Sequence, residues 1–150
     1  MSQSLAQIYV HAIFSTKNRV PCLAPDLCAE LYPYTVQVLN NMNCPAIQVG
    51  GVSDHMHILC RMSKNVDASK LIEGIKTPTS KWVKTQGTGL RNFYWQGGYG
   101  VFSVSPTNLD RVKRYILGQE EHHKKVTFQD EFRNFLKRYQ IEYDERYVWD

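Results

Sequence analysis

The 150-residue sequence contains no hydrophobic run long enough to span a bilayer, which takes about 20 consecutive apolar residues. Residues 1–4 lack the positively charged segment and apolar run of a signal peptide, so we expect a cytoplasmic protein without a membrane partner. The four cysteines form no Cys-x-x-Cys pair, which argues against a zinc ribbon, and we expect them to be reduced.

Nucleotide-binding and zinc-protease motifs are also missing. The glycine-rich segment 97–100 lacks the spacing, the lysine and the preceding strand of a phosphate-binding loop, so we expect no nucleotide cofactor. The absence of a His-Glu-x-x-His pattern weakens an interpretation as a small zinc hydrolase. Lys and Arg number 18 against 14 Asp and Glu, and the resulting net charge of +4 permits a polyanionic partner without demanding one.

Alternation of apolar and polar residues predicts four strands, and helical spacing predicts two helices between them. The expected order is strand 7–15, helix 26–41, strand 46–52, strand 55–61, helix 66–85 and strand 101–105. This β-α-β-β-α-β order is typical of a ferredoxin-like (RRM-like) α+β fold, in which one antiparallel sheet carries both helices on one face. Two extra C-terminal helices are expected, the first reaching residue 125 and the second covering residues 128–139. We expect residues 1–150 to form a single domain.

Local signals refine this prediction. The candidate N-cap residues are Asp67, Ser105 or Thr107, and Thr127. Pro78 is expected to kink or divide the second helix, because a proline inside a helix removes one hydrogen bond. Gly50 and Gly51 suggest a bulge or tight bend in the second strand. The aromatic residues within 140–150 predict that this tail docks on the domain or on a partner chain.

The sequence His55-Met56-His57 lies at the start of a predicted strand. Successive side chains of a strand point to opposite faces, so His55 and His57 share one face and Met56 points to the other. Two adjacent imidazoles can chelate a divalent metal, although a His-x-His alone is more often a pair of surface histidines. His11, on the first strand, either lines the same site or is a hydrogen-bonded structural histidine, and we slightly prefer the structural role.

A second group of candidate site residues lies on the predicted third helix. Tyr115 and Gln119 are four residues apart and therefore share a helix face. Gln119 can supply a neutral oxygen ligand, while the phenol oxygen of Tyr115 can attack phosphorus once a nearby cation or base favours its deprotonation. A divalent ion held by two imidazoles and one amide keeps positions open for phosphate and water, which points to Mg²⁺ or Mn²⁺.

His55-Met56-His57 followed by Tyr115-x-x-x-Gln119 resembles the single-tyrosine HUH transposases of the IS200/IS605 insertion-sequence family. Segments 54–59, 95–100 and 142–149 agree with this resemblance, which covers nearly the whole chain. The His-x-His pattern is weak by itself, whereas the combination in this order and spacing is specific.

The resemblance implies a transposase that recognises single-stranded DNA hairpins at insertion-sequence ends. It makes His55, His57 and Gln119 metal ligands and Tyr115 the nucleophile that forms a 5′-phosphotyrosine and releases a 3′-hydroxyl. It also implies a homodimer with composite active sites, in which the histidines come from one subunit and the tyrosine helix from the other. Gly118 lies between Tyr115 and Gln119, and we expect local flexibility there.

Other residues are candidates for DNA contacts. Basic side chains that could bind phosphates are Lys17, Arg19, Lys81, Lys84 and Arg114. Tyr94, Trp95 and Tyr99 could stack on unpaired bases, although core packing is the better interpretation for Trp95.

His122 and His123, next to Glu120 and Glu121, could form a second metal cluster. A solvated helix end is the more common explanation for such a run.

An alternative function stays open. A ferredoxin-like sheet derived from a transposase could bind hairpin DNA or RNA without cutting it. The combination of two histidines, a glutamine and a tyrosine argues against a pure binding protein, because binding alone does not need these groups.

Overall fold

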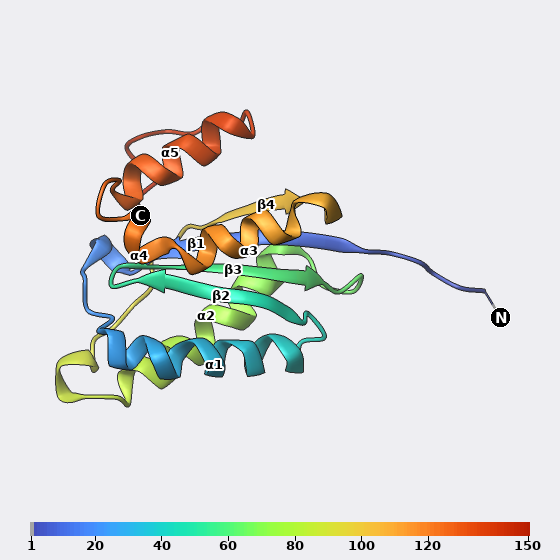
Figure 1. The fold of residues 1–150 in the computed structure, drawn as a ribbon. Helices are drawn as coiled ribbons and strands as arrows, with labels where there is room; N and C mark the ends of the chain where they lie inside the picture. The colour runs from blue at the N-terminus through green and yellow to red at the C-terminus, as the bar shows by residue number, and fades with distance from the viewer. Residues whose placement is uncertain (1) are drawn as a thin grey trace.

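Four antiparallel strands form the central layer of the computed structural model, which describes residues 2–150 (Figure 1). They are β1 (Ile8–Ser15), β2 (Ala46–Val52), β3 (His55–Met62) and β4 (Gly100–Val104). Their order in the sheet is β2-β3-β1-β4, so β1 and β3 are central neighbours. The predicted ferredoxin-like α+β architecture is confirmed.

One face of the sheet is covered by α1 (Pro25–Asn41) and α2 (Ala68–Lys84), which lie side by side below the strands in Figure 1. Every second residue of the central strands points into this layer. These buried apolar residues are Val10, Ala12 and Phe14 of β1 and Met56, Ile58 and Cys60 of β3. The alternate residues, including the histidines, therefore face the opposite side.

The opposite face is covered by three C-terminal helices, α3 (Leu109–Leu117), α4 (Gln119–His122) and α5 (Phe128–Arg138) (Figure 1). The prediction of one helix reaching residue 125 is wrong, because the chain leaves helical geometry at Gly118, where φ is −91° and ψ is 13°. Short 3₁₀ turns occur at η1 (Lys17–Arg19), η2 (Thr88–Leu90) and η3 (Pro106–Asn108).

Two of the predicted helix caps are confirmed. Asp67 accepts a hydrogen bond from the backbone N–H of Lys70, and Thr127 accepts one from Asp130. Neither Ser105 nor Thr107 caps α3, because η3 precedes the helix and places Asn108 at its N-cap.

Neither Pro78 nor the Gly50–Gly51 pair interrupts its element, and a kink at Pro78 stays a prediction. Pro78 does not divide α2, which continues to Lys84 because its apolar face is held in the core. The irregularity of β2 lies between Ala46 and Gln48, whereas Gly50 and Gly51 pair regularly with β3.

The C-terminal tail docks on α5, as its aromatic residues predicted. The Trp149 ring lies 6.4 Å from that of Phe128 and 6.0 Å from that of Phe132, measured between centroids. The C-terminal backbone is also fixed, because the N–H of Gly98 donates to the carbonyl of Asp150 at 2.8 Å. Tyr147 stays exposed.

The four cysteines are free thiols. Across residues 2–150, none of the helices combines the length and the apolar character that a membrane crossing demands.

Lys76 of α2 fixes the loop that leads into β4. Its Nζ donates to the carbonyls of Gln96 and Gly98, both at 2.7 Å, and burial lowers its pKa to about 8. The folded state therefore releases this proton at lower pH than the unfolded state, whose lysines titrate near 10.4. Between these values the unfolded chain binds more protons, so raising the pH favours folding at this residue.

We therefore expect the stability of the wild type relative to Lys76→Met to increase as the pH rises from 8 to 10. Urea denaturation at several pH values measures this difference. Lys81→Met is the matched control for the loss of a lysine from α2, because Lys81 lies exposed on the same helix. A flat profile for Lys76→Met would contradict the lowered pKa.

Candidate active site

A buried polar seam separates two apolar clusters on the face covered by the C-terminal helices. Ile116 of α3 packs on Leu59 and Val104, whereas the apolar residues of α5 pack on Ile13 and Phe102. The polar side chains between them are at most 2 % exposed, and they are His11, His55, His57, Gln119 and Glu131. Burying so many polar groups is costly unless each has a partner, so their contacts define the site.

His55 and His57 point to the same face of β3, as predicted, and their ring centroids lie 5.1 Å apart. The Nδ1 of His55 is 2.6 Å from Asp54 Oδ1, and the Nδ1 of His57 is 2.8 Å from His11 Nε2. Both Nε2 atoms are thus left to face the seam. His11 belongs to the site and also has the hydrogen-bonded role that the sequence analysis preferred.

Helix α3 brings Tyr115 to these histidines. The Tyr115 ring lies 5.7 Å from that of His57 and 6.3 Å from that of His11, between centroids. The approach depends on Gly50 of β2, where an added Cβ would lie 2.8 Å from Ile116 Cγ2 and 3.0 Å from the Ile116 carbonyl oxygen. The glycine thus allows α3 to pack directly against the sheet.

Gly50→Val is expected to displace α3 and to destabilise the fold by about 1–3 kcal/mol, the usual cost of overpacking. Urea denaturation measures the loss. Gly89→Val is the matched control, because no atom other than those of its chain neighbours lies within 4 Å of an added Cβ there. Equal stability of the two variants would show that α3 does not need the close approach.

Gln119 begins α4 directly after the break at Gly118, and its side chain still reaches the histidines. Its Oε1 is 3.1 Å from His55 Nε2, while its Nε2 donates to Glu131 Oε2 at 3.3 Å. The structure thus brings together Tyr115, His55, His57 and Gln119 within one chain. Their catalytic and metal-binding roles, and the composite dimer site, remain predictions.

Glu131 of α5 is the member of the site that the sequence analysis missed. Its Oε1 lies 3.0 Å from His57 Nε2, and its Oε2 accepts hydrogen bonds from Tyr115 Oη and from Gln119. A signal was present in the sequence, because Glu131 occupies the i+3 position of the apolar stripe formed by Phe128, Phe132 and Leu136. A carboxylate on the buried face of a helix indicates a specific partner.

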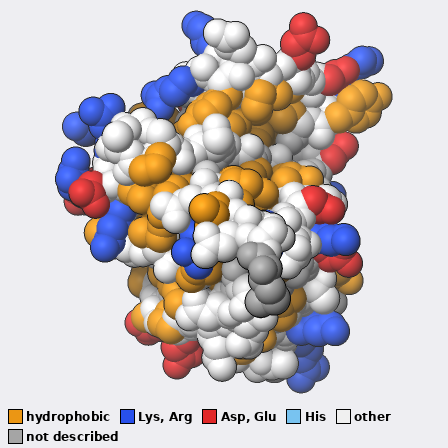
Figure 2. All heavy atoms as spheres, turned by 90° about the vertical axis from the view of Figure 1, so that its right-hand side faces the viewer, with side chains coloured by type: hydrophobic (Ala, Val, Ile, Leu, Met, Phe, Trp, Pro, Cys, Tyr) orange, Lys and Arg blue, Asp and Glu red, His pale blue; other side chains and the backbone are white. Residues whose placement is uncertain are grey.

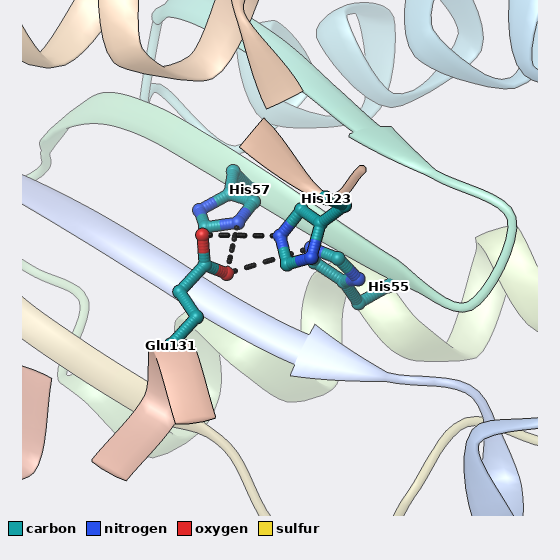
Figure 3. Close-up of side chains that lie close together, drawn as sticks. All are labelled: His55, His57, His123 and Glu131. Carbon is teal, nitrogen blue, oxygen red and sulfur yellow. Dashed lines mark hydrogen bonds and ion pairs between the residues drawn. The ribbon is translucent and has the colours of Figure 1, made fainter. Parts of the chain in front are cut away.

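His122 and His123 also join this site, which corrects our preference for a solvated helix end. Both Nε2 atoms lie 3.1 Å from Glu131 Oε2. Figure 3 shows His123 and His57 converging on the Glu131 carboxylate, with His55 beside them. The histidine run therefore does not form a separate second cluster.

Burial and the carboxylate of Glu131 shift the pKa values of the side chains in the seam. Burial lowers the pKa of His57 to about 4, although the hydrogen bond and charge of Glu131 oppose this. Burial would raise the pKa of Glu131, but hydrogen bonds from His123 and His57 outweigh it and hold that pKa well below the ordinary value. Burial, reinforced by Glu131, raises the pKa of Tyr115, so the phenol needs a cation nearby to ionise.

The donor atoms of the seam fit a divalent metal. With Asp54 accepting the proton on Nδ1 of His55, the Nε2 atom of that ring faces the oxygen lone pairs of Gln119 Oε1, at 3.1 Å, and Glu131 Oε1, at 3.5 Å. Such facing lone pairs repel unless a proton or a cation lies between them. One ligand atom from each of His55, His57, His123 and Glu131 lies within 4.8 Å of the others, a spread that one ion can gather with small adjustments.

The predicted DNA-contact residues fall into separate groups. Lys17 and Lys84 lie near Tyr94. The backbone N–H of Lys17 donates to the backbone carbonyl of Tyr94, and Lys84 Nζ is 4.2 Å from the Tyr94 ring centroid. Arg19 lies 5.8 Å from the Trp149 ring centroid. Lys81 and Arg114 are exposed on α2 and α3.

The aromatic candidates also differ. Trp95 is a core residue, as preferred, with its Nε1 donating to Thr79 at 3.0 Å. Tyr94 is 60 % exposed and Tyr99 is 40 % exposed, so both rings remain accessible for stacking.

A cavity of about 550 Å³ opens beside Tyr115, between α3, β4 and α5. Arg111, Asn134 and Arg138 line it together with the Tyr139 ring, so cationic, amide and aromatic groups are close to the phenol.

The face of the molecule in Figure 2 carries hydrophobic side chains over its upper half, with lysines and arginines mainly along the edges.

Comparison with known proteins identifies the family. The model of the family described as IS200-like transposases matches residues 4–119. The chain belongs to the IS200-like transposase family. The match ends at Gln119, so it includes both histidines of β3, Tyr115 and Gln119 but not α5. A search of curated proteins found no match for this transposase-family chain.

Solved structures share the transposase fold. A crystal structure of a candidate transposase from Deinococcus radiodurans R1 has a TM-score of 0.62 and 16 % identity, and the alignment covers 79 % of this chain and 98 % of that one. A REP-associated tyrosine transposase bound to a REP hairpin has a TM-score of 0.59 and 16 % identity, covering 84 % of this chain and 76 % of that one. At such identities the likeness establishes a common fold.

Proposed function

We propose that this IS200-like transposase cleaves and rejoins single-stranded DNA at hairpins, with Tyr115 as the nucleophile. The observation that carries the proposal is the position of the Tyr115 ring, 5.7 Å from that of His57, in a seam with His55 and Gln119. A binding protein would gain nothing from burying these groups together, because each one costs desolvation energy.

Cleavage uses the phenol oxygen of Tyr115. This oxygen attacks the phosphorus of a phosphodiester, the bond from phosphorus to the 3′-oxygen breaks, and the product is a 5′-phosphotyrosine with a free 3′-hydroxyl. The phenolic proton leaves toward an acceptor, and Glu131 already accepts the Tyr115 hydrogen bond. The departing 3′-oxygen takes up a proton. Rejoining is the reverse reaction, in which a 3′-hydroxyl attacks the phosphotyrosine and releases Tyr115, so no ATP is needed.

His55, His57 and Gln119 are the predicted metal ligands of this reaction. A bound Mg²⁺ or Mn²⁺ would supply positive charge for the phosphate oxygens. Asp54 and His11 hold the two imidazoles by their Nδ1 atoms and so orient Nε2 toward the site.

Hairpin DNA is the proposed substrate. The family membership and the fold shared with a tyrosine transposase that binds a REP hairpin support this choice. The basic groups near Tyr94 and the cavity beside Tyr115 are proposed to hold backbone phosphates and unpaired bases.

The test is to incubate the protein with a labelled single-stranded DNA hairpin and Mn²⁺ or Mg²⁺, then to separate the products on a denaturing gel. A hairpin panel derived from the imperfect palindromes flanking the gene supplies the substrates. A covalent protein–DNA adduct that needs the metal supports the proposal. A shift on a native gel without any adduct across the panel would favour the alternative, a hairpin-binding protein that does not cut.

A further inference from the structure

We infer that the C-terminal segment completes the metal site, with Glu131 of α5 as a carboxylate ligand and His123, directly after α4, as a further imidazole ligand. This inference rests on the proposed metal-binding role of His55 and His57. It adds two groups that lie beyond residues 4–119, the part of the chain that matches the family model. Figure 3 shows the carboxylate of Glu131 reaching from α5 to the histidines of the sheet.

The buried charge of Glu131 supports a metal nearby. The side chain is 2 % exposed, and its ion-pair partners within residues 2–150 are all histidines. No lysine or arginine in that part of the chain supplies a permanent positive charge to it. Hydrogen bonds with His57 and His123 offset the burial cost of this carboxylate, and a divalent ion held by the surrounding imidazoles would add a permanent cation beside it.

The packing of α5 also supports a binding role for Glu131. Phe128, Phe132 and Leu136 fix the helix in the apolar cluster with Ile13 and Phe102, and Glu131 lies on the same helix face. An apolar residue at position 131 would continue this stripe at no desolvation cost. The rigid delivery of a carboxylate to His57 Nε2, at 3.0 Å, therefore indicates a role in binding rather than in docking the helix.

The donor set also indicates which ions fit. Glu131 reduces the net charge of a site otherwise built from neutral imidazoles and an amide. Its Oε1 faces His55 and His57, while its Oε2 faces His123 and Tyr115. The same carboxylate therefore contacts both the proposed metal ligands and the Tyr115 phenol. Imidazole-rich sites prefer transition metals, so Mn²⁺ and Co²⁺ are expected to bind more tightly than Mg²⁺.

Coupling between the metal and α5 follows from this arrangement. An ion that is coordinated by residues of both β3 and α5 would connect the helix to the sheet. The C-terminal tail, which packs on α5, would be held in place as well. Metal binding is therefore expected to slow hydrogen exchange of the α5 amides, because local opening of the helix would break metal–ligand bonds.

Isothermal titration of the full-length protein with MnCl₂ and CoCl₂ tests the inference without relying on catalysis. Glu131→Gln keeps the size of the side chain and removes its charge, so Mn²⁺ affinity is expected to fall about 10- to 100-fold. His123→Asn should lower the affinity in the same direction. Glu142→Gln is the matched control, an exposed glutamate in the same C-terminal segment, and should bind like the wild type.

Hydrogen exchange provides the second readout. Mn²⁺ should protect the α5 amides of the wild type and of Glu142→Gln, but not those of Glu131→Gln. Circular dichroism checks the fold of each variant. If Glu131→Gln does not fold, Glu131→Asp and His123→Asn supply the test, and weaker Mn²⁺ binding by both is then required.

Two results would overturn the inference: Mn²⁺ affinity within two-fold of the wild type in the folded variants, or tighter binding by Glu131→Gln, which would make the carboxylate a competitor for the site. Failure of the proposed function looks different. A wild type that binds Mn²⁺ through Glu131 yet forms no DNA adduct refutes the transposase chemistry alone. An adduct that forms while Glu131→Gln binds Mn²⁺ normally refutes only the ligand role of α5.

Discussion

Replacement of Tyr115 by phenylalanine is expected to reduce the covalent protein–DNA adduct below detection while hairpin binding persists. The substitution removes the attacking oxygen and keeps the ring that packs near His11 and His57. Denaturing gels measure the adduct, and native gels measure binding of the same labelled hairpin. The dissociation constant should change little, because phosphate contacts made by other residues supply most of the affinity.

The control for this variant is Tyr139→Phe. Tyr139 also lines the cavity, but its hydroxyl donates to the backbone carbonyl of Ser103, away from the histidines. It is expected to retain the adduct. A persisting adduct in Tyr115→Phe would assign the nucleophile to another residue, and mass spectrometry of the DNA-linked peptide would then locate it.

His57→Ala should lose metal-dependent cleavage almost completely and bind Mn²⁺ at least 10- to 100-fold more weakly, since even outer partners of a metal site have effects of that size. The variant removes a predicted ligand and also leaves Glu131 Oε1 without its 3.0 Å contact. We therefore expect a loss of about 1–3 kcal/mol in the free energy of unfolding without metal. Calorimetry, urea denaturation and the adduct assay measure the three effects.

Undiminished cleavage by folded His57→Ala would remove this residue from the metal site. Mixing the inactive Tyr115→Phe and His57→Ala variants then separates two arrangements of the active site. A composite dimer, as the family resemblance implies, regains activity on mixing, because one of its two sites combines an intact histidine pair with an intact tyrosine. A site completed within one chain stays inactive.

The parts of the fold that follow from local pattern were predictable. Alternation in β1 and β3 correctly placed His55 and His57 on one face, because that period depends only on strand geometry. The break at Gly118 was not predictable in the same way, since the 3.6-residue pattern continues through it and a single glycine is tolerated in many helices.

The separate groups of the site were predictable from local pattern, but the contacts between distant elements were not. Glu131 and His57 are 74 residues apart and meet only because α5 crosses the sheet. Glu131 could still have been noticed as a carboxylate on an apolar helix face. The interpretation of His122 and His123 as solvated failed because the position of α5 over that loop was not available from local signals.

The break at Gly118 places Tyr115 and Gln119 on two different helices, α3 and α4. Gln119 is buried at the start of α4, whereas Tyr115 lies in the nine-residue helix α3, which ends at Leu117 before the break. Glycine has the widest backbone freedom of any residue, so Gly118 is the position where the angle between the two helices can change at the least cost. A turn of α3 about Gly118 would therefore move the Tyr115 ring while leaving the Gln119 side chain beside His55.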